Sequence, residues 1–447
     1  MDIRSAANTD TAVVVLPGVG RSAAARRVVL AVLGLLAVVG LPVLFYRLGA
    51  GLGVTRLGSG VPWGLWVAFY IYFIGLSAGS FLLSTLIYVF KNEKLEPLGR
   101  LAVLQAFVCL VTGMTFILVD LGHWERFWHP LVYPQWRSVL TWEIWAYLIY
   151  TAVLLAELWF LMRCDLARWA EEARWEAQRL YKILSLGFHC PTNEMEWRVC
   201  DTQTRRWLMI LGVIGIPVAL LVHGGTGAIF AVVKARPAWY TPIFPVVFIV
   251  SALASGGGLL LLLRTFLAPR SDNDRDTLCT LARLTGGFLV LDLGLLFLEF
   301  LVGTYGGIPD HVAPYRLMAF GPFWWVFWVQ QLLLGAVVPL LLIYIRTDRA
   351  GAFRLGLAGL LIILGIFGVR LNIVIPALAA PILPGFDHAL ASARLSSLYV
   401  ANWVEWLSSL GIVAAAALAA LAAMRLLPMT EHQPYSSHVW EARDVRV

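Results

Sequence analysis

The sequence predicts an all-α integral membrane protein with about ten transmembrane helices. The 447 residues are 60% hydrophobic and only 14% charged, and the mean hydropathy is +0.78. These values exclude an ordinary soluble domain. A helix needs about 20 apolar residues to cross the hydrocarbon core of a bilayer. Windows of that kind lie at 28–46, 64–90, 101–120, 139–162, 207–232, 243–267, 279–303, 321–345, 354–378 and 399–426.

The first window follows Arg26 and Arg27, as the apolar part of a signal peptide would. Its apolar stretch from Val28 to Tyr46 is too long for that role, and no small-residue cleavage site follows it. We therefore expect a retained first helix.

Most of the 34 lysines and arginines fall in alternate loops, on the side that holds the N-terminus. The positive-inside rule then predicts that both termini lie in the cytoplasm. The membrane that we expect is the bacterial inner membrane. The net charge of +7 follows from this topology, and no nucleic-acid partner is expected.

A weak internal repeat divides the chain. Residues 75–80 (GLSAGS) are echoed by residues 251–256 (SALASG), and residues 118–122 (LVDLG) by residues 290–294 (VLDLG). Four helices separate equivalent positions, so the repeats share one orientation. We predict two parallel four-helix bundles with two flanking helices. The segments are a cytoplasmic end over 1–27, a membrane domain over 28–428 with halves at about 64–232 and 243–378, and a cytoplasmic tail over 429–447.

The longest loop, from Asp165 to Arg206, lies on the predicted cytoplasmic side. Apolar residues recur there at helical spacing between Leu166 and Leu184, which predicts an amphipathic helix on the membrane surface. The cysteines on this side are expected to be thiols. A metal site at His189, Cys190 and Cys200 fits no known ligand spacing.

Ionisable residues lie within or at the ends of the apolar windows. A charge at the bilayer centre costs roughly 2.5 to 3.5 kcal/mol on translocon scales, so such residues usually face the interior of a bundle and mark a proton, ion or ligand path. The residues concerned are Asp120, Glu143, Glu157, His223, Asp292, Glu299, Arg370 and Glu405.

Polar motifs gather toward the predicted outer leaflet, and their mixture of groups suits a quinone. A quinone head group needs hydrogen-bond donors at its carbonyls, a proton donor or acceptor beside each, and apolar walls. We expect Glu143, His223 and Asp120 to carry the chemistry. The expected quinone contacts are His123, Arg126, Tyr133, Arg370, Asn372 and Glu405.

Each of these residues also has a structural interpretation. Asp120 with Arg126 would make an ion pair at a helix end, and His223 would be a packed, hydrogen-bonded histidine. Arg370 within an apolar helix needs a counter-charge, which a structural partner supplies as well as a ligand does. Tryptophans at this level are typical of an aromatic belt.

Deeper carboxylates suggest a second role. Glu157 lies toward the cytoplasm, while Asp292 and Glu299 are seven residues apart and share one helix face. Staggered carboxylates relay protons through water, so these three are the expected proton path. The alternative is polar packing between helices. Haem ligation needs pairs of histidines inside helices, and only His223 lies well within one, so neither haem nor a metal is expected.

Several stretches together resemble the membrane subunits of the polysulfide reductase and nitrite reductase type, the NrfD/PsrC-like family. Within that family the sequence is most similar to the HybB-like branch, the membrane subunit of nickel–iron hydrogenases. The matching stretches are 63–66 (WGLW), 75–79 (GLSAG), 120–122 (DLG), 126–128 (RFW), 223–227 (HGGTG), 235–237 (ARP), 370–372 (RLN) and 403–406 (WVEW).

The resemblance implies a cofactor-free subunit that binds menaquinone or ubiquinone as substrate near the outer face. It also implies a ferredoxin-like iron–sulfur subunit that connects it to a catalytic redox subunit. Asp120, His123, Glu143, His223 and Arg370 occupy the positions carried over. His123 stands where many relatives have another residue after Asp-Leu-Gly.

The leading hypothesis is thus a quinone-reactive membrane subunit of a respiratory oxidoreductase. Whether it also translocates protons stays open. The competing hypotheses are a secondary transporter, which also uses parallel repeats and buried charges, and a passive anchor for an exported redox complex. An anchor needs none of the buried carboxylates. The identity of the catalytic partner, the quinone type and the direction of electron flow stay open.

Overall fold

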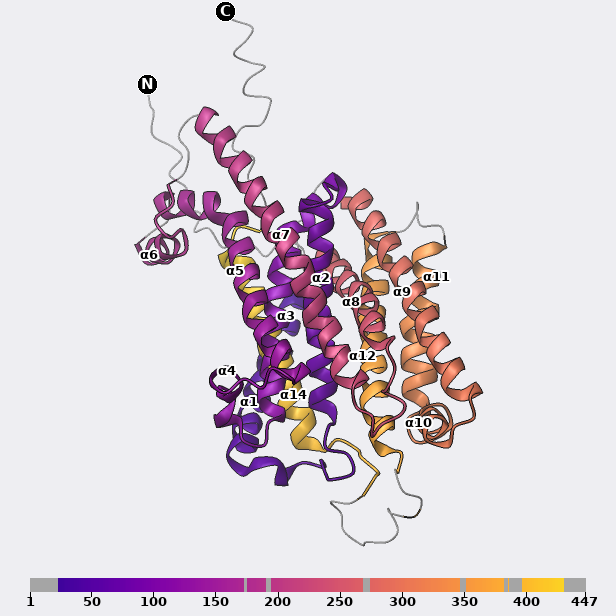
Figure 1. Cartoon of the computed structure of the whole chain (residues 1–447). Helices are drawn as coiled ribbons and strands as arrows, with labels where there is room; N and C mark the ends of the chain where they lie inside the picture. The colour runs from indigo at the N-terminus through magenta and orange to yellow at the C-terminus, as the bar shows by residue number, and fades with distance from the viewer. Residues whose placement is uncertain are drawn as a thin grey trace, which may run out of the picture.

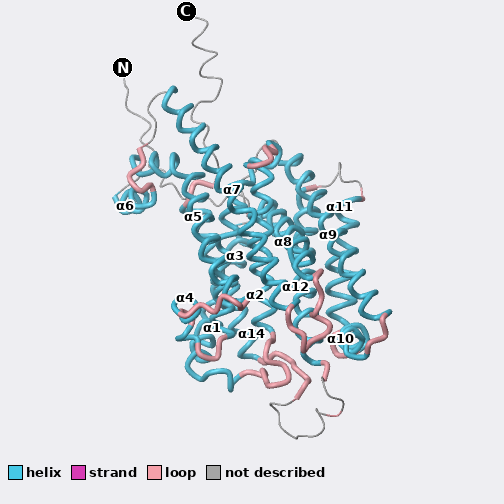
Figure 2. Tube along the Cα trace, in the orientation of Figure 1, coloured by secondary structure: helices cyan, strands magenta, loops and turns pink. Residues whose placement is uncertain are grey.

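The computed structural model describes residues 23–172, 175–189, 194–267, 274–345, 351–381, 385 and 396–429. Over these residues the chain is helical and forms no strand (Figures 1 and 2). The predicted end segments 1–27 and 429–447 lie almost entirely outside the described residues, as do Cys190 and His388.

Ten stretches of the described chain are long and apolar enough to cross a membrane, which confirms the predicted all-α multi-pass fold. They are α1 (Ala23–Ala50), α2 (Leu65–Tyr88), α3 (Gly99–Asp120), α5 (Val139–Glu172), α7 (Glu194–Ala231), α8 (Phe244–Phe266), α9 (Asp274–Tyr305), the pair η4 (Val326–Val337) and α11 (Val338–Tyr344), α12 (Ala352–Ala379) and α14 (Trp403–Leu426).

Short helices connect these stretches. They are η1 (Gly51–Val54), η2 (Glu93–Leu98), η3 (Trp124–Arg126), α4 (His129–Val132), α6 (Trp175–Leu184) and α10 (Pro309–Phe320). In Figure 1, α4 and α10 lie at the end of the molecule opposite α6. The loops predicted to face outward therefore share one end, which we call the outer end.

The predicted boundaries were too short on the opposite side. Helix α5 continues to Glu172 and α7 already begins at Glu194, so both project beyond the apolar windows of 139–162 and 207–232. The predicted surface helix between Leu166 and Leu184 is the end of α5 followed by α6. Hydropathy identifies only the apolar section of a helix that crosses the lipid. The polar turns at its end extend the same helix into the membrane interface.

Helices pack on one another within each predicted half and also between the halves. In the first half α2 packs on α3 and α7, and α5 packs on α7; in the second half α8 packs on α9 and α12, and η4 packs on α12. Helices α1 and α14 pack against each other and flank the halves. The contact of α2 with α8 joins the halves, and there a Cβ atom on Gly256 would lie 2.5 Å from the backbone carbon of Gly79. Small residues thus allow the two backbones to approach closely.

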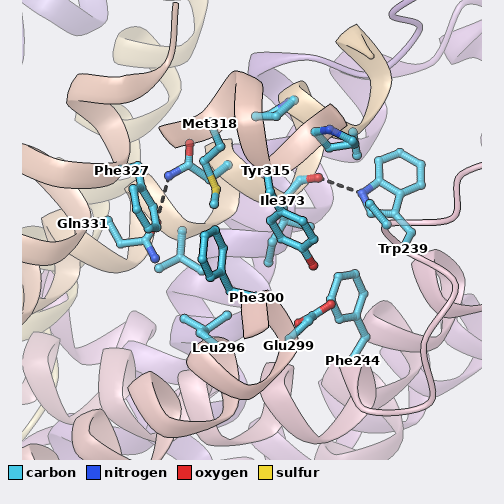
Figure 3. A pocket seen from close by; sticks show the side chains of 16 residues that line it. Trp239, Phe244, Leu296, Glu299, Phe300, Tyr315, Met318, Phe327, Gln331 and Ile373 are labelled. Carbon is cyan, nitrogen blue, oxygen red and sulfur yellow. Dashed lines mark hydrogen bonds between the residues drawn. The ribbon is translucent and has the colours of Figure 1, made fainter. Parts of the chain in front are cut away.

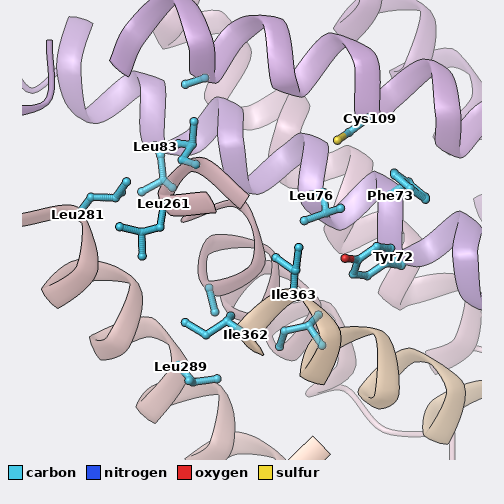
Figure 4. Close-up of a cluster of buried hydrophobic side chains, with 14 of the residues drawn as sticks. Tyr72, Phe73, Leu76, Leu83, Cys109, Leu261, Leu281, Leu289, Ile362 and Ile363 are labelled. Atoms are coloured by element: carbon cyan, nitrogen blue, oxygen red, sulfur yellow. The ribbon is translucent and has the colours of Figure 1, made fainter. Parts of the chain in front are cut away.

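The largest apolar cluster lies between α2, α3, α8, α9 and α12. Figure 4 shows Leu76 and Cys109 on one side of it and Leu261 and Ile362 on the other. Large apolar side chains are also exposed around the outside of the molecule, for example on α1, α9 and η4. Lipid removes that surface from water, so the exposure fits a membrane protein.

Candidate functional site

A chain of polar side chains, all buried except the partly buried Tyr70, crosses both halves of the molecule. We call this set the polar layer: Tyr70 on α2, Glu143 and Tyr147 on α5, His223 and Thr226 on α7, Ser251 on α8, Asp292 on α9 and Arg370 on α12. It brings together four residues that the sequence predicted as site or proton-path residues, namely Glu143, His223, Asp292 and Arg370.

Glu143 lies at the first-half end of the polar layer and is 1% exposed. Its Oε1 atom accepts hydrogen bonds from Tyr70 Oη at 2.8 Å, from Tyr147 Oη at 2.7 Å and from Thr226 Oγ1. Its Oε2 atom is buried and has no hydrogen-bond partner among the described residues. Because buried carboxylate oxygens are normally paired, this oxygen is available to a proton, a water molecule or a substrate.

Arg370 is fully buried at the centre of the layer. Its Nη2 atom donates to Ser251 Oγ at 2.9 Å and lies 3.4 Å from His223 Nε2. The guanidinium also stacks over the Phe248 ring at 4.5 Å. A Cβ atom on Gly75 would lie only 3.0 Å from the His223 ring, so a glycine in α2 leaves room for this arrangement.

Asp292 supplies the negative charge that interacts with Arg370. Both of its carboxylate oxygens are buried and have no hydrogen-bond partner among the described residues. Arg370 thus has a counter-charge on α9, as the structural interpretation required, but the two groups do not share a hydrogen bond. The two carboxylate oxygens of Asp292 are thus open to a proton.

A cavity of about 80 Å³ opens in the second half, near the outer end. Figure 3 shows its aromatic walls, made by Trp239, Phe244, Phe300 and Phe327. Its polar lining is Glu299, Tyr315, Gln331 and Asn372. We call it the α9–α12 cavity. It joins Asn372, predicted as a quinone contact, with Glu299, predicted as a proton-path residue.

The polar groups of this cavity are partly engaged with one another. Asn372 Nδ2 donates to Gln331 Oε1 at 2.8 Å, which leaves Gln331 Nε2 as a donor and Asn372 Oδ1 as an acceptor. Glu299 Oε1 is buried and lacks a hydrogen-bond partner in the described chain. Burial raises the pKa of the Tyr315 hydroxyl, and the charge of Glu299 raises it further, so this hydroxyl stays a neutral donor.

The helix η4 is a π-helix over twelve residues, which is unusually long for a form seen mostly as single turns near functional sites. It supplies Phe327 and Gln331 to the cavity. A Cβ atom on Gly335 would collide with Gly365 of α12, so these helices are in backbone contact farther along. At the level of the cavity the two helices are joined by the hydrogen bond from Asn372 to Gln331.

Asp120 and Glu405 lie away from the polar layer. Asp120 interacts electrostatically with Arg47 of α1, whose guanidinium donates to Leu121 O at 2.8 Å and stacks over Trp66. The predicted alternative of an Asp120–Arg126 ion pair is therefore wrong. Arg126 is exposed and lies 3.9 Å from Glu125.

Glu405 is the N3 residue of α14, where it forms a capping box with Asn402. Its Oε2 atom accepts from the backbone N–H of Asn402 at 3.0 Å and of Arg56 at 3.2 Å, and its Oε1 atom accepts from Tyr399. Both oxygens therefore have structural partners. A quinone contact at Glu405 remains a prediction, and it would have to displace one of them.

His123, Arg126 and Tyr133 lie on the connection between α3 and α5, at the outer end of the first half. Tyr133 is 71% exposed, and His123 Nδ1 lies 2.9 Å from Glu125 Oε1. A backbone hydrogen bond and the neighbouring His123 lower the pKa of Glu125. These three residues therefore form an exposed surface and do not line the α9–α12 cavity.

Glu157 is buried on α5, fourteen residues beyond Glu143. Its Oε2 atom is another buried oxygen with no partner among the described residues. It lies about 21 Å from Glu143 along the helix axis, at 1.5 Å per residue. No described contact connects it to the polar layer, so its place in a proton path stays a prediction.

The sequence reasoning missed the hydroxyl and amide members of the site. Tyr147 is one turn beyond Glu143 and Thr226 is one turn beyond His223, so helical spacing was a usable signal for both. Ser251, Tyr315 and Gln331 carried no such signal. Among the described residues, no group of three His, Cys, Asp or Glu is placed to hold a metal ion.

Comparison with known proteins assigns the family. Residues 53–381 match the family described as "Polysulphide reductase, NrfD". The C subunit of the selenate reductase of Mesobacillus selenatarsenatis is 42% identical over 408 residues, which cover 91% of this chain and 95% of that protein. The Hdr-like menaquinol oxidoreductase integral membrane subunit of Archaeoglobus fulgidus is 28% identical over 82% of this chain and 84% of its own length. The menaquinone reductase integral membrane subunit of Nitratidesulfovibrio vulgaris is 25% identical over 81% and 82%. The chain belongs to the polysulphide reductase, NrfD family.

Proposed function

We propose that this chain is the quinone-reactive membrane subunit of a respiratory oxidoreductase. It exchanges electrons between an iron–sulfur subunit on the periplasmic side and the quinone pool. The names of two relatives support the quinone class, since they are a menaquinol oxidoreductase subunit and a menaquinone reductase subunit. The observation that carries the proposal is the α9–α12 cavity, which combines aromatic walls with donors and an unpartnered carboxylate.

The lining of the cavity matches the two ends of a quinone head group. Gln331 Nε2 and the Tyr315 hydroxyl are donors for a carbonyl oxygen, and Glu299 accepts from a hydroxyl of the reduced form. Aromatic side chains such as Phe300 and Phe327 cover the faces of the ring. The quinone, menaquinone or ubiquinone, is a substrate that supplies the redox chemistry. The protein orients it and moves the protons.

Protons released or taken up at the cavity have a route inward. Glu299 and Asp292 are seven residues apart on α9, about 10 Å along the helix axis. Asp292 interacts with Arg370, and the polar layer continues through His223 and Thr226 to Glu143. Carboxylates staggered in this way relay protons through intervening water. Glu157, farther along α5, extends the same series toward the opposite side.

The exposed surface at the outer end of the first half suits a protein partner. Trp128 and Tyr133 are exposed there beside His123 and Arg126, and interfaces are enriched in aromatic residues and arginine. We assign this surface to the iron–sulfur subunit, which connects to a catalytic subunit. The selenate reductase relative favours a reductase of that type as the partner; a nickel–iron hydrogenase, as in the HybB-like branch, is the alternative.

Two neighbouring glutamines test the quinone site. Gln331 lines the cavity, whereas the Gln330 amide donates to Leu364 O at 3.0 Å. We expect Gln331→Leu to raise the apparent KM for a water-soluble quinol at least tenfold in the assembled complex, because one buried hydrogen bond to the substrate is lost. Gln330→Leu serves as the matched control. Equal kinetics in both variants would overturn the assignment of the α9–α12 cavity as the quinone site.

Copurification tests the wider proposal. Mass spectrometry of the complex from gently solubilised membranes should recover an iron–sulfur subunit and a catalytic redox subunit, whose identity names the reaction. Repeated isolation of the chain with neither redox partner nor quinone would favour the transporter hypothesis instead. Recovery of the partners with normal turnover in Glu143→Gln and Gln331→Leu variants would favour a passive anchor.

A further inference from the structure

Two cysteines meet where α5 and α7 extend past the apolar windows. Cys164 Sγ lies 3.3 Å from Cys200 Sγ, although the residues are 36 positions apart. Cys200 is buried and Cys164 is partly exposed. No disulfide joins the cysteines of the described chain. Neither residue belongs to the polar layer or to the α9–α12 cavity.

Arg163 fixes the relative position of the two helices at this point. Its Nη2 atom donates to Thr204 Oγ1 at 2.9 Å and lies 3.7 Å from Cys200 Sγ. Its guanidinium is 4.6 Å from the centre of the Phe188 ring and 5.0 Å from that of Phe160. The thiols are therefore held together by a packed side chain and do not meet on loose termini.

The pair lies outside the sections of α5 and α7 that cross the hydrocarbon core of the membrane. Cys164 is 25 residues beyond Val139, about 38 Å along α5, and Cys200 is 31 residues before Ala231, about 46 Å along α7. The hydrocarbon core is only about 30 Å thick. Since both helices begin or end at the outer end, the thiols lie in the aqueous or interfacial region at the opposite end.

We propose that Cys164 and Cys200 form a redox-active dithiol that closes to a disulfide by exchange with a low-molecular-weight disulfide such as oxidised glutathione. The sulfur atoms need to approach from 3.3 Å to a bond of about 2.05 Å. The cross-link ties α5, which carries Glu143, to α7, which carries His223.

The disulfide forms in two thiol–disulfide exchange steps. The partly exposed Cys164 attacks one sulfur of the oxidant, which forms a mixed disulfide and releases one small thiol. Cys200 then attacks the Cys164 sulfur, which forms the intramolecular disulfide and releases the second small thiol. The two cysteines lose two electrons and two protons, and the oxidant gains them.

Mass spectrometry of the full chain in its native complex tests the proposal. The complex is reduced, equilibrated in buffers of rising oxidised-to-reduced glutathione ratio, quenched with an alkylating agent and digested. We expect a disulfide-linked pair of peptides containing Cys164 and Cys200, which dithiothreitol reverses. The buried Cys109 and Cys279 should show no linkage over the same range and are the internal controls.

Three variants sharpen the result. In Cys200→Ser the resolving thiol is gone, so Cys164 should retain a glutathione adduct, whereas Cys164→Ser should block the reaction. Cys190→Ser should leave the Cys164–Cys200 linkage intact. Full alkylation of both thiols at every ratio would overturn the proposal, as would linkage of either one to Cys190 in the wild-type chain. The wild-type measurement decides the matter even if a variant fails to assemble.

Discussion

Two buried glutamates of this chain have very different surroundings. Glu405 has partners on both carboxylate oxygens, because it belongs to the cap of α14. Glu143 gathers three hydroxyl donors on one oxygen and leaves the other buried and unpaired within the described residues. The first arrangement stabilises a helix end. The second leaves a group able to exchange a proton.

Replacing Glu143 with glutamine should therefore impair proton transfer and leave the packing intact. We expect Glu143→Gln to lower quinol-linked turnover by about 10²-fold or more, the usual contribution of a positioned acid or base. Turnover of purified complex, with assembly checked by size-exclusion chromatography, measures the effect. Asp201→Asn on the exposed start of α7 is the control, and turnover equal to that control would contradict the role of Glu143.

The Arg370–Asp292 pair predicts charge compensation. Removing one member of a buried pair leaves an uncompensated charge and typically costs about 3–5 kcal/mol. We expect Arg370→Gln and Asp292→Asn each to lower the thermal midpoint of the detergent-solubilised complex, and the double variant to recover part of the loss. Additive losses in the double variant would show that the two side chains do not interact.

Sequence reasoning found the ionisable members of the site and missed their neutral partners. Glu143, His223, Asp292 and Arg370 stand out because a charge in an apolar helix is costly. Tyr70, Ser251 and Gln331 are ordinary residues in such helices, so only their contacts reveal them. For Asp120, the alternative interpretation was an ion pair with Arg126, six positions away, whereas the cation that acts on it is Arg47 of another helix.

At the scale of the elements, close helix contact depends on a few glycines. Gly79 of α2 faces Ala252 of α8, and Gly256 of α8 faces the Gly79 backbone. These glycines therefore serve the packing of α2 on α8. In η4, by contrast, the π-helical winding begins ahead of Gly335, the single glycine of this element, and no sequence pattern predicted it.

Adding one methyl group at the α2–α8 contact should separate the two halves. We expect Gly79→Ala to lower the stability of the solubilised protein by about 1–3 kcal/mol, the usual cost of overpacking, because the new Cβ would collide with the Ala252 carbonyl. Gly294→Ala is the matched control, since nothing lies within 4 Å of its added Cβ. Thermal unfolding followed by tryptophan fluorescence compares them, and equal midpoints would show that this contact contributes little to stability.

At the scale of the whole molecule, ten crossings put the first and last described residues at the same end. The charge pattern predicts that this end lies in the cytoplasm. We expect green fluorescent protein fused to the C-terminus to be fluorescent and alkaline phosphatase fused there to be inactive. The opposite pair of results would invert the topology and move the exposed surface around Tyr133 to the cytoplasm, away from a periplasmic partner.

The sequence by itself determined the class of the protein, the number of crossings and the ionisable residues worth attention. It did so because the length and apolarity of a membrane helix are local properties that need no knowledge of neighbours. Only the tertiary structure decided which polar residues meet. Helices buried on one side by protein and on the other by lipid are apolar all round, so periodicity does not say which face turns inward. The separation of Asp120 and Glu405 from the polar layer, and the cavity between α9, η4 and α12, follow from packing between residues far apart in the chain.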